Sequence, residues 1–148
     1  MKTVLCAVNS AYIHKNLAVM KLSAYLKDKV SVAEFNVNTP RDSVYNELLK
    51  ENADVYCFST YIWNIEYIKA IAERLKKATN AIIILGGPEA GGDAEGFVKK
   101  NPYCDYVIKG EGELALESLL KAIEKGENAD FPGIYHKNGG YGTALGLK

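Results

Sequence analysis

The sequence predicts a three-layer α/β fold, a Rossmann-like arrangement in which helices cover both faces of a parallel sheet. Strand-like and helical segments alternate five times along the chain, which is the pattern of right-handed strand–helix–strand crossovers. One segment, Ile82–Leu85, is apolar throughout and runs straight into Gly86-Gly87-Pro88, as a strand buried on both faces does when it ends abruptly. Another, Val30–Phe35, contains a charged residue and suits the edge of the sheet. Together these observations predict the flavodoxin-like strand order 2-1-3-4-5.

The first β–α unit is expected at the N-terminus. Val4–Val8 is a short apolar strand, and a polar loop follows it. From about Ile13 to Asp28 the apolar residues recur with a helical period, which places Leu17, Met20 and Ala24 on one stripe, with Leu22, Tyr25 and Leu26 beside it.

The second helix is expected to begin beside a proline. Thr39 is the expected N-cap, Pro40 takes the first helical position, and Asp42 completes a weak capping box. The buried face of this helix is expected to consist of Val44, Leu48 and Leu49.

The remaining elements continue the alternation. Val55–Ser59 is the expected third strand, Ala94–Lys100 a short helix and Asp105–Ile108 the fifth strand, after which Gly110–Glu113 opens the last helix. Between the third and fourth strands lies the most amphipathic helix, and its inward positions are expected to be Ile65, Ile68, Ile71, Ala72 and Leu75.

The pattern weakens towards the C-terminus. Phe131–His136 is a candidate for one short extra strand, and the glycine-rich segment 138–148 is typical of a linker. We therefore expect a domain at 1–137 and a tail at 138–148 that leads to a missing C-terminal domain.

Composition narrows the function classes. In the 148 residues, 18 basic side chains balance 18 acidic ones without long runs of either sign, so we expect neither a nucleic-acid groove nor a membrane surface. The sequence has neither a bilayer-spanning apolar run nor a signal peptide, and a cytoplasmic protein is expected. Cys6, Cys57 and Cys104 lie far apart inside or beside apolar runs, which indicates reduced core cysteines.

The predicted strand order places a ligand crevice at the carboxyl edge, between strands one and three. Its expected walls are Asn9–His14 and Ser59–Trp63, with Gly86–Gly92 and Lys109–Gly112 along the same rim. The first loop is neither a dinucleotide G-x-G-x-x-G motif nor a P-loop, and it lacks the Ser, Thr and Gly of a flavodoxin phosphate loop. Receiver-domain acidic residues are also absent from their expected places. The crevice therefore suits a large, flat and partly apolar ligand.

Four stretches at this rim together resemble a known family. The chain is similar to the cobalamin-binding domain that precedes the radical S-adenosylmethionine barrel in one branch of that enzyme superfamily. The resemblance covers essentially the whole chain, and the stretches that carry it are Asn9–Leu17, Ser59–Asn64, Leu85–Glu89 and Lys109–Glu113.

The resemblance implies a cofactor and a larger protein. Cobalamin would bind to this domain, whereas S-adenosylmethionine and an iron–sulfur cluster would bind to a C-terminal radical S-adenosylmethionine domain of the same chain. The parent would be methyltransferase-like, catalysing methyl transfer or a related radical rearrangement or reduction. No catalytic and no metal-ligating residue is expected here. The implied cofactor-binding residues are Ser10, Ala11, Tyr12, Ile13, Ser59, Thr60, Tyr61, Gly86, Gly87, Pro88, Glu89, Gly110, Glu111 and Gly112.

The first loop departs from the better-known members of this family. Their DxHxxG motif carries a histidine that coordinates cobalt, and here Asn9, Ala11 and His14 stand at the aspartate, histidine and glycine positions. The resemblance therefore implies cobalamin with its own base displaced and no protein ligand, with Tyr12 or Ile13 covering the cobalt. His14 is expected to be a solvated or loop-capping histidine.

Several of these residues have a structural explanation beside the functional one. Ser59 either contacts the displaced nucleotide base or caps the next helix, a role that Asn64 also suits. Gly86 and Gly87 either admit the nucleotide tail or form a plain tight turn. Tyr61 and Trp63 are either rim aromatics against the corrin or helix-packing residues. In the same way, Glu111 either accepts hydrogen bonds from corrin amides or faces a following domain.

Two other functions stay open from the sequence. The first is a degenerate, non-catalytic docking or scaffold domain that no longer binds cobalamin, which the missing histidine favours. The second is an unrelated flavodoxin-like binder of a flavin or small metabolite, against which the first loop argues.

Overall fold

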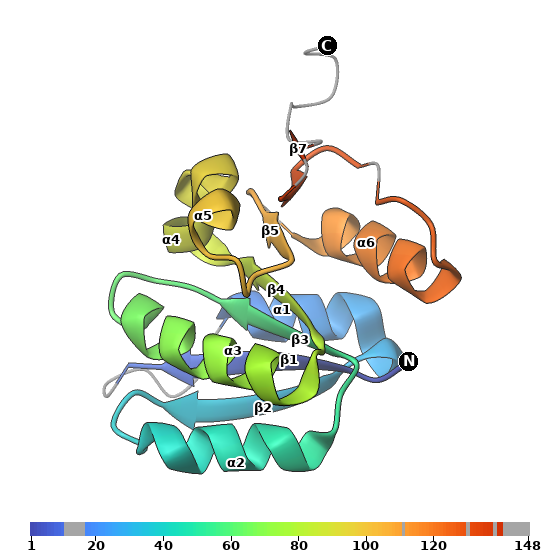
Figure 1. Ribbon diagram of the computed structural model, residues 1–148. Coiled ribbons are helices and arrows are strands. Elements are labelled where there is room, and N and C mark those ends of the chain that lie inside the picture. The colour runs from blue at the N-terminus through green and yellow to red at the C-terminus, as the bar shows by residue number, and fades with distance from the viewer. Residues whose placement is uncertain (11–16, 111, 130, 138, 141–148) are drawn as a thin grey trace.

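The computed structural model describes residues 1–10, 17–110, 112–129, 131–137 and 139–140 (Figure 1). Its single sheet has the strand order β2-β1-β3-β4-β5-β6-β7, so the predicted order 2-1-3-4-5 is confirmed. The strands are β1 (Thr3–Asn9), β2 (Ser31–Asn36), β3 (Val55–Ser59), β4 (Ile82–Gly86), β5 (Tyr106–Ile108), β6 (Ile134–His136) and β7 (Gly139–Gly140). The helices are α1 (Leu17–Leu26), the 3-10 turn η1 (Lys27–Lys29), α2 (Arg41–Glu51), α3 (Ile65–Thr79), α4 (Gly87–Gly92), α5 (Ala94–Lys100) and α6 (Glu113–Lys125).

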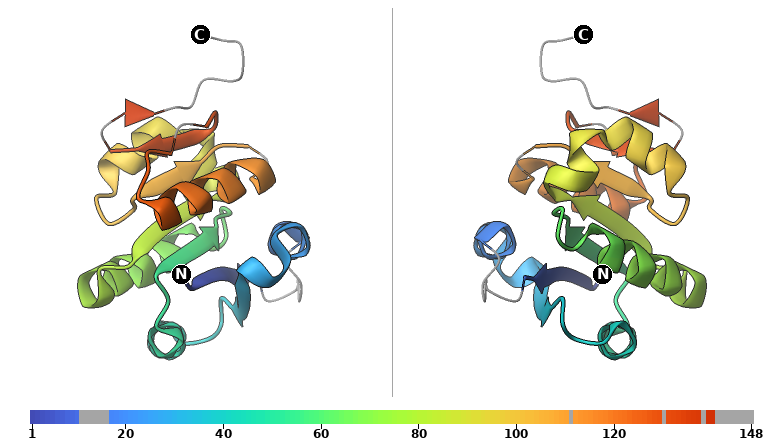
Figure 2. Two further views of the ribbon diagram at one scale, coloured as in Figure 1. Left: turned by 90° about the vertical axis from the view of Figure 1, so that its right-hand side faces the viewer. Right: turned by 90° about the vertical axis from the view of Figure 1, so that its left-hand side faces the viewer.

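Helices cover both faces of the sheet, as the alternation predicts. Views along the sheet show α1 and α6 on one face and α2 and α3 on the other (Figure 2). Alternate residues of each strand point to opposite faces. Leu5, Cys57 and Ile84 therefore pack with α1 and α6, whereas Tyr56 and Ile83 pack with α2, α3 and α5.

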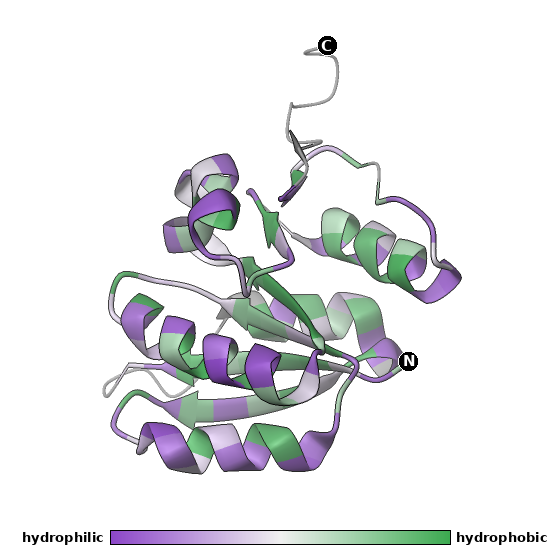
Figure 3. Ribbon diagram, viewed as in Figure 1, coloured by the Kyte–Doolittle hydropathy of each residue, from purple (hydrophilic) through white to green (hydrophobic). Residues whose placement is uncertain are grey.

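Burial along the strands follows their position in the sheet. All residues of β1 and β3 are buried, which requires the continuous apolar runs seen in the sequence (Figure 3). The predicted edge strand β2 is mostly exposed or half-buried. Cys6, Cys57 and Cys104 are free and buried, and burial raises the pKa of the Cys57 and Cys104 thiols to about 12.

The stripe predicted for α1 is wrong at Met20 and Ala24, and the side chain of Leu17 lies outside the described residues. Met20 is 43% exposed and Ala24 is exposed, whereas Val19 and Leu26 are buried. Nearly every residue of this helix is apolar, so the sequence offers two stripes of similar hydrophobicity. The position of α1 against the sheet and α6 selects the stripe that contains Val19.

The predicted capping of α2 is also wrong. The helix begins at Arg41 with Pro40 as its N-cap, and no side chain caps it. The Thr39 carbonyl instead accepts a hydrogen bond from the Tyr67 hydroxyl on α3. Asp42 lies 2.6 Å from the guanidinium of Arg74, which also belongs to α3.

Two elements differ from expectation, α4 after β4 and β7 after β6. The expected turn Gly86-Gly87-Pro88 is the start of a short helix, α4, in which the proline takes an early position that needs no N–H donor. Ala94–Lys100 forms α5 as predicted, and the Asp93 carboxylate accepts a hydrogen bond from the Gly96 amide. Antiparallel β6 confirms the extra strand, and β7 pairs with it inside the segment where we expected a linker.

Candidate functional site

A cavity of about 630 Å³ lies between α1, α6 and the sheet, at the carboxyl edge. This volume is within the range of about 300–1,000 Å³ that ligand pockets occupy. Its lining consists of Leu5, Val19, Lys21, Leu22, Cys57, Phe58, Ser59, Tyr61, Ile84, Gly86, Gly87, Pro88, Gly91, Gly92, Ile108, Lys109, Gly110, Gly112, Glu113 and Leu116.

The floor and walls of the cavity are apolar. Leu5, Cys57 and Ile84 face it from three adjacent strands, and Leu22 and Leu116 flank it from the two helices. Sequence reasoning missed these residues because each one looks like an ordinary core position. A signal was present all the same: counting back by two along a strand from Ser59 or Gly86 reaches the residue on the same face.

Ser59 and Gly86 lie opposite each other where β3 and β4 end. Ser59 does not cap α3, because that helix begins after Asn64. Instead, the buried Asn64 side chain accepts from the Tyr61 amide (2.7 Å) and donates to the Val8 carbonyl (2.9 Å). Within the described residues the Ser59 hydroxyl forms no hydrogen bond. It therefore stays available to a ligand in the cavity.

Positions 86 and 87 are both glycine, but for different structural reasons. Gly86 has extended backbone, and a Cβ there would be in ordinary contact with the Ile108 carbonyl at 3.7 Å. Gly87 has φ +89°, and a Cβ there would overlap the Thr60 backbone. Of these two glycines, Gly86 alone therefore leaves space that a side chain would otherwise fill. Gly87 is required by the backbone itself.

Thr60 joins the third strand to α4. Its hydroxyl donates to the Gly86 carbonyl (2.5 Å) and accepts from the Ala90 amide (2.9 Å), and the residue is fully buried. Its role in this structure is to hold the start of α4 against the end of β3.

Two further glycines of α4 border the cavity. A Cβ at Gly91 would lie 3.0 Å from the Ile108 carbonyl, so the helix approaches β5 closely there. Gly92 has open space around it. Bare backbone therefore forms one side of the cavity mouth.

Tyr61 and Trp63 form a stacked pair at the rim. Their ring centroids are 4.5 Å apart with planes 5° from parallel. Tyr61 lines the cavity, while Trp63 is 45% exposed and Ile62 between them is 80% exposed. These exposures argue against a role in packing the helices.

Of the ten predicted site residues that the structure describes, seven line the cavity. Ser59, Tyr61, Gly86, Gly87, Pro88, Gly110 and Gly112 line the cavity. Ser10, Thr60 and Glu89 are absent from its lining, and the Ser10 carbonyl accepts a hydrogen bond from the Asn36 side chain (3.1 Å). Ala11, Tyr12, Ile13, His14 and Glu111 lie outside the described residues.

An ion pair joins the two helices at the cavity wall. Lys21 of α1 lies 3.0 Å from Glu113 of α6, and both residues belong to the lining. The backbone amide of Glu113 and the Lys21 ammonium hold the pKa of the Glu113 carboxyl below its usual value. The ionised Glu113 carboxylate, held first by its backbone amide and then by Lys21, therefore stabilises the fold above the unfolded-state pKa of glutamate. This contribution is lost as pH falls through the lower folded-state pKa.

This arrangement predicts the titration of Glu113. In a carbon-13 NMR titration its carboxyl should titrate below the usual range for glutamate, and Lys21→Gln should raise its pKa towards that range. Lys29→Gln, which removes a cation beside Glu117 instead, should leave it unchanged. An unchanged pKa in Lys21→Gln would show that the backbone amide alone is responsible.

The chain with this glycine-bordered cavity also matches a protein-family model. The model of the B12 binding domain matches residues 3–120. The chain belongs to the B12-binding domain family. Its relationship to radical S-adenosylmethionine methyltransferases is supported by its relatives.

One curated relative is the cobalamin-dependent radical SAM methyltransferase TokK of Streptomyces tokunonensis. It is 32% identical over 90 residues, covering 58% of this chain and 13% of that protein. The chain thus corresponds to a small part of this relative's length.

Solved structures share the fold. OxsB, a cobalamin-dependent S-adenosylmethionine radical enzyme solved with aqua-cobalamin and S-adenosylmethionine, has a TM-score of 0.74 at 21% identity, covering 92% of this chain and 21% of that one. TsrM of Kitasatospora setae, a radical S-adenosylmethionine methyltransferase, has a TM-score of 0.75 at 19% identity, covering 95% and 29%.

Among the described residues, the structure has neither a metal-ligand cluster nor a membrane-spanning helix. The described residues contain no cluster of three metal-ligating side chains. In the same part of the chain, no helix is long and apolar enough to cross a membrane.

Proposed function

We propose that this chain holds cobalamin with its nucleotide tail in the cavity between α1, α6 and the sheet. The observation that carries the proposal is an apolar cavity of about 630 Å³ at the carboxyl edge, in a chain that matches the B12 binding domain over residues 3–120. Open α/β sheets bind ligands at this edge, at the point where the strand order reverses.

The residues that are present fit this cofactor. The apolar floor of Leu5, Cys57 and Ile84 suits the flat aromatic base at the end of the tail. At the mouth, the Ser59 hydroxyl is available for a hydrogen bond, and the absent side chain of Gly86 leaves room for the chain of the tail. Tyr61 borders the same opening, where the corrin ring would follow.

We propose further that the chain presents the corrinoid to an iron–sulfur and S-adenosylmethionine domain of a longer protein. When bound, cobalamin supplies a cobalt centre that accepts and donates methyl groups. This chain's own residues would hold the cofactor, exclude water from its base and keep one corrin face open at the sheet edge. Methyl transfer or related radical chemistry would then take place in the adjoining domain. The names of TokK and TsrM, both methyltransferases, support this proposal.

Titration with hydroxocobalamin tests the binding proposal. Saturable binding in calorimetry is expected, with a visible spectrum that lacks the signature of a coordinated histidine or benzimidazole, before and after reduction. Absence of binding to this chain and also to its full-length parent would favour the non-catalytic scaffold. A yellow protein with flavin absorbance would favour the flavin-binding alternative.

A further inference from the structure

The described residues that line the cavity carry more positive than negative charge. Among the described lining residues only Lys21, Lys109 and Glu113 carry a charge. Glu113 neutralises Lys21 at 3.0 Å. Lys109 forms no ion pair or side-chain hydrogen bond with any described residue, so one positive charge is left over among the described lining residues.

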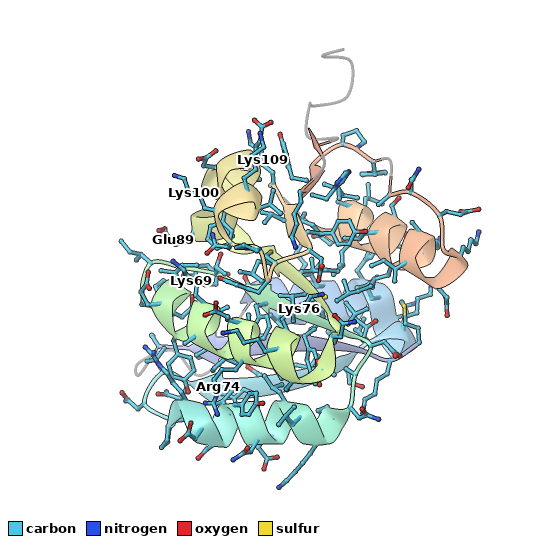
Figure 4. The ribbon with its side chains drawn as sticks, in the orientation of Figure 1. Lys69, Arg74, Lys76, Glu89, Lys100 and Lys109 are labelled. Carbon is cyan, nitrogen blue, oxygen red and sulfur yellow. The ribbon has the colours of Figure 1, made fainter. Side chains whose placement is uncertain are left out.

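The backbone around Lys109 is held in place while its side chain is exposed. The Lys109 amide donates to the Gly133 carbonyl (2.8 Å), and the close approach of Gly91 brings α4 against the same residue. Lys109 follows the end of β5 and lies apart from Lys69, Arg74 and Lys76, which come from α3 (Figure 4). The backbone that carries this cation is therefore held at the carboxyl edge, beside the glycines of the mouth.

An apolar cavity with one uncompensated cation at its mouth fits a ligand of complementary chemistry. Such a ligand has an apolar ring that enters the cavity and a single negative charge that stays at the entrance. The nucleotide tail of cobalamin has this pattern, because a phosphodiester with one negative charge links its aromatic base to the corrin. A partly exposed lysine is suited to a phosphate group, which it contacts as a point charge.

We propose that the Lys109 ammonium pairs with the phosphodiester of the cofactor's nucleotide tail and makes the site selective for complete corrinoids over those that lack the nucleotide. This inference rests on the proposed function and assigns a specificity-determining residue to it. Lys21 is excluded from this role as long as it remains paired with Glu113.

The test compares two ligands and three variants of the 148-residue chain. Hydroxocobalamin carries the phosphodiester, and diaquocobinamide has the corrin ring without phosphate, ribose or base. Lys109→Gln removes the charge, and Lys109→Arg keeps it. Lys100→Gln is the matched control, because Lys100 is an exposed lysine at the end of α5 that does not line the cavity (Figure 4).

Lys109→Gln should weaken hydroxocobalamin binding by roughly three- to tenfold, as expected for a partly exposed charge contact. Its effect on diaquocobinamide should be less than about twofold, and Lys109→Arg should restore most of the loss. Raising the salt concentration should reduce the difference between wild type and Lys109→Gln, because an exposed pair is screened.

Three outcomes would overturn the inference. They are equal weakening of both ligands by Lys109→Gln, no weakening of either, or the same loss in Lys100→Gln. If wild-type protein bound neither corrinoid, the proposed function itself would fail, and that result is distinguishable from the other three.

Discussion

Replacing Gly86 by leucine should abolish cobalamin binding while the protein stays folded. Gly86 faces the cavity at the end of β4, directly opposite Ser59. Its extended backbone accepts any L-residue, and a Cβ would be 3.7 Å from the Ile108 carbonyl. The rest of a leucine side chain would then occupy the space needed by the ligand. We expect the affinity for hydroxocobalamin to fall by at least about 100-fold, which corresponds to about 2.7 kcal/mol.

The measurement is calorimetric titration, with thermal unfolding followed by circular dichroism as the check on folding. Gly86→Ala is the graded control and should give a smaller loss, because one methyl group fills little of the mouth. If Gly86→Leu folded and bound hydroxocobalamin normally, the ligand would not pass through this part of the cavity, and the proposed site would be wrong.

Replacing the next residue, Gly87, should instead destabilise the fold. Gly87→Ala places a Cβ against the Thr60 backbone at φ +89°, a conformation that L-residues rarely adopt. The Thr60 backbone and the start of α4 cannot move apart without cost, because the Thr60 hydroxyl hydrogen-bonds to the Gly86 carbonyl and the Ala90 amide. We expect the free energy of unfolding to fall by about 3 kcal/mol.

Urea denaturation measures this change, and Gly92→Ala provides the matched control. A Cβ at Gly92 meets no atom within 4 Å, so that variant should differ from wild type by less than about 0.5 kcal/mol. Equal stability of Gly87→Ala and wild type would mean that α4 shifts freely, contrary to the contacts at Thr60. The two adjacent glycines would then be explained by ligand space alone.

Some expectations from the sequence depend only on neighbouring residues, and these agree with the structure. The apolar run Ile82–Leu85 is a buried strand, the mixed segment that ends at Phe35 is the edge, and Ala94–Lys100 is a helix. Strand order and the location of the rim follow from such local signals, because right-handed crossovers leave few ways to arrange alternating elements. The order of the elements alone therefore suffices to place the glycines and Ser59 at one edge of the sheet.

The sequence by itself determined the fold class, the strand order, the rim and the family resemblance. Tertiary structure decided what each rim residue does, because those roles come from contacts between distant segments. Thr60 is occupied by Gly86 and Ala90, whereas Ser59 beside it is available. The buried stripe of α1 was likewise decided by its packing and not by its hydrophobicity. The charge left on Lys109 appears only once Lys21 and Glu113 are seen to pair, since neighbours in space rather than in sequence set the balance of charge.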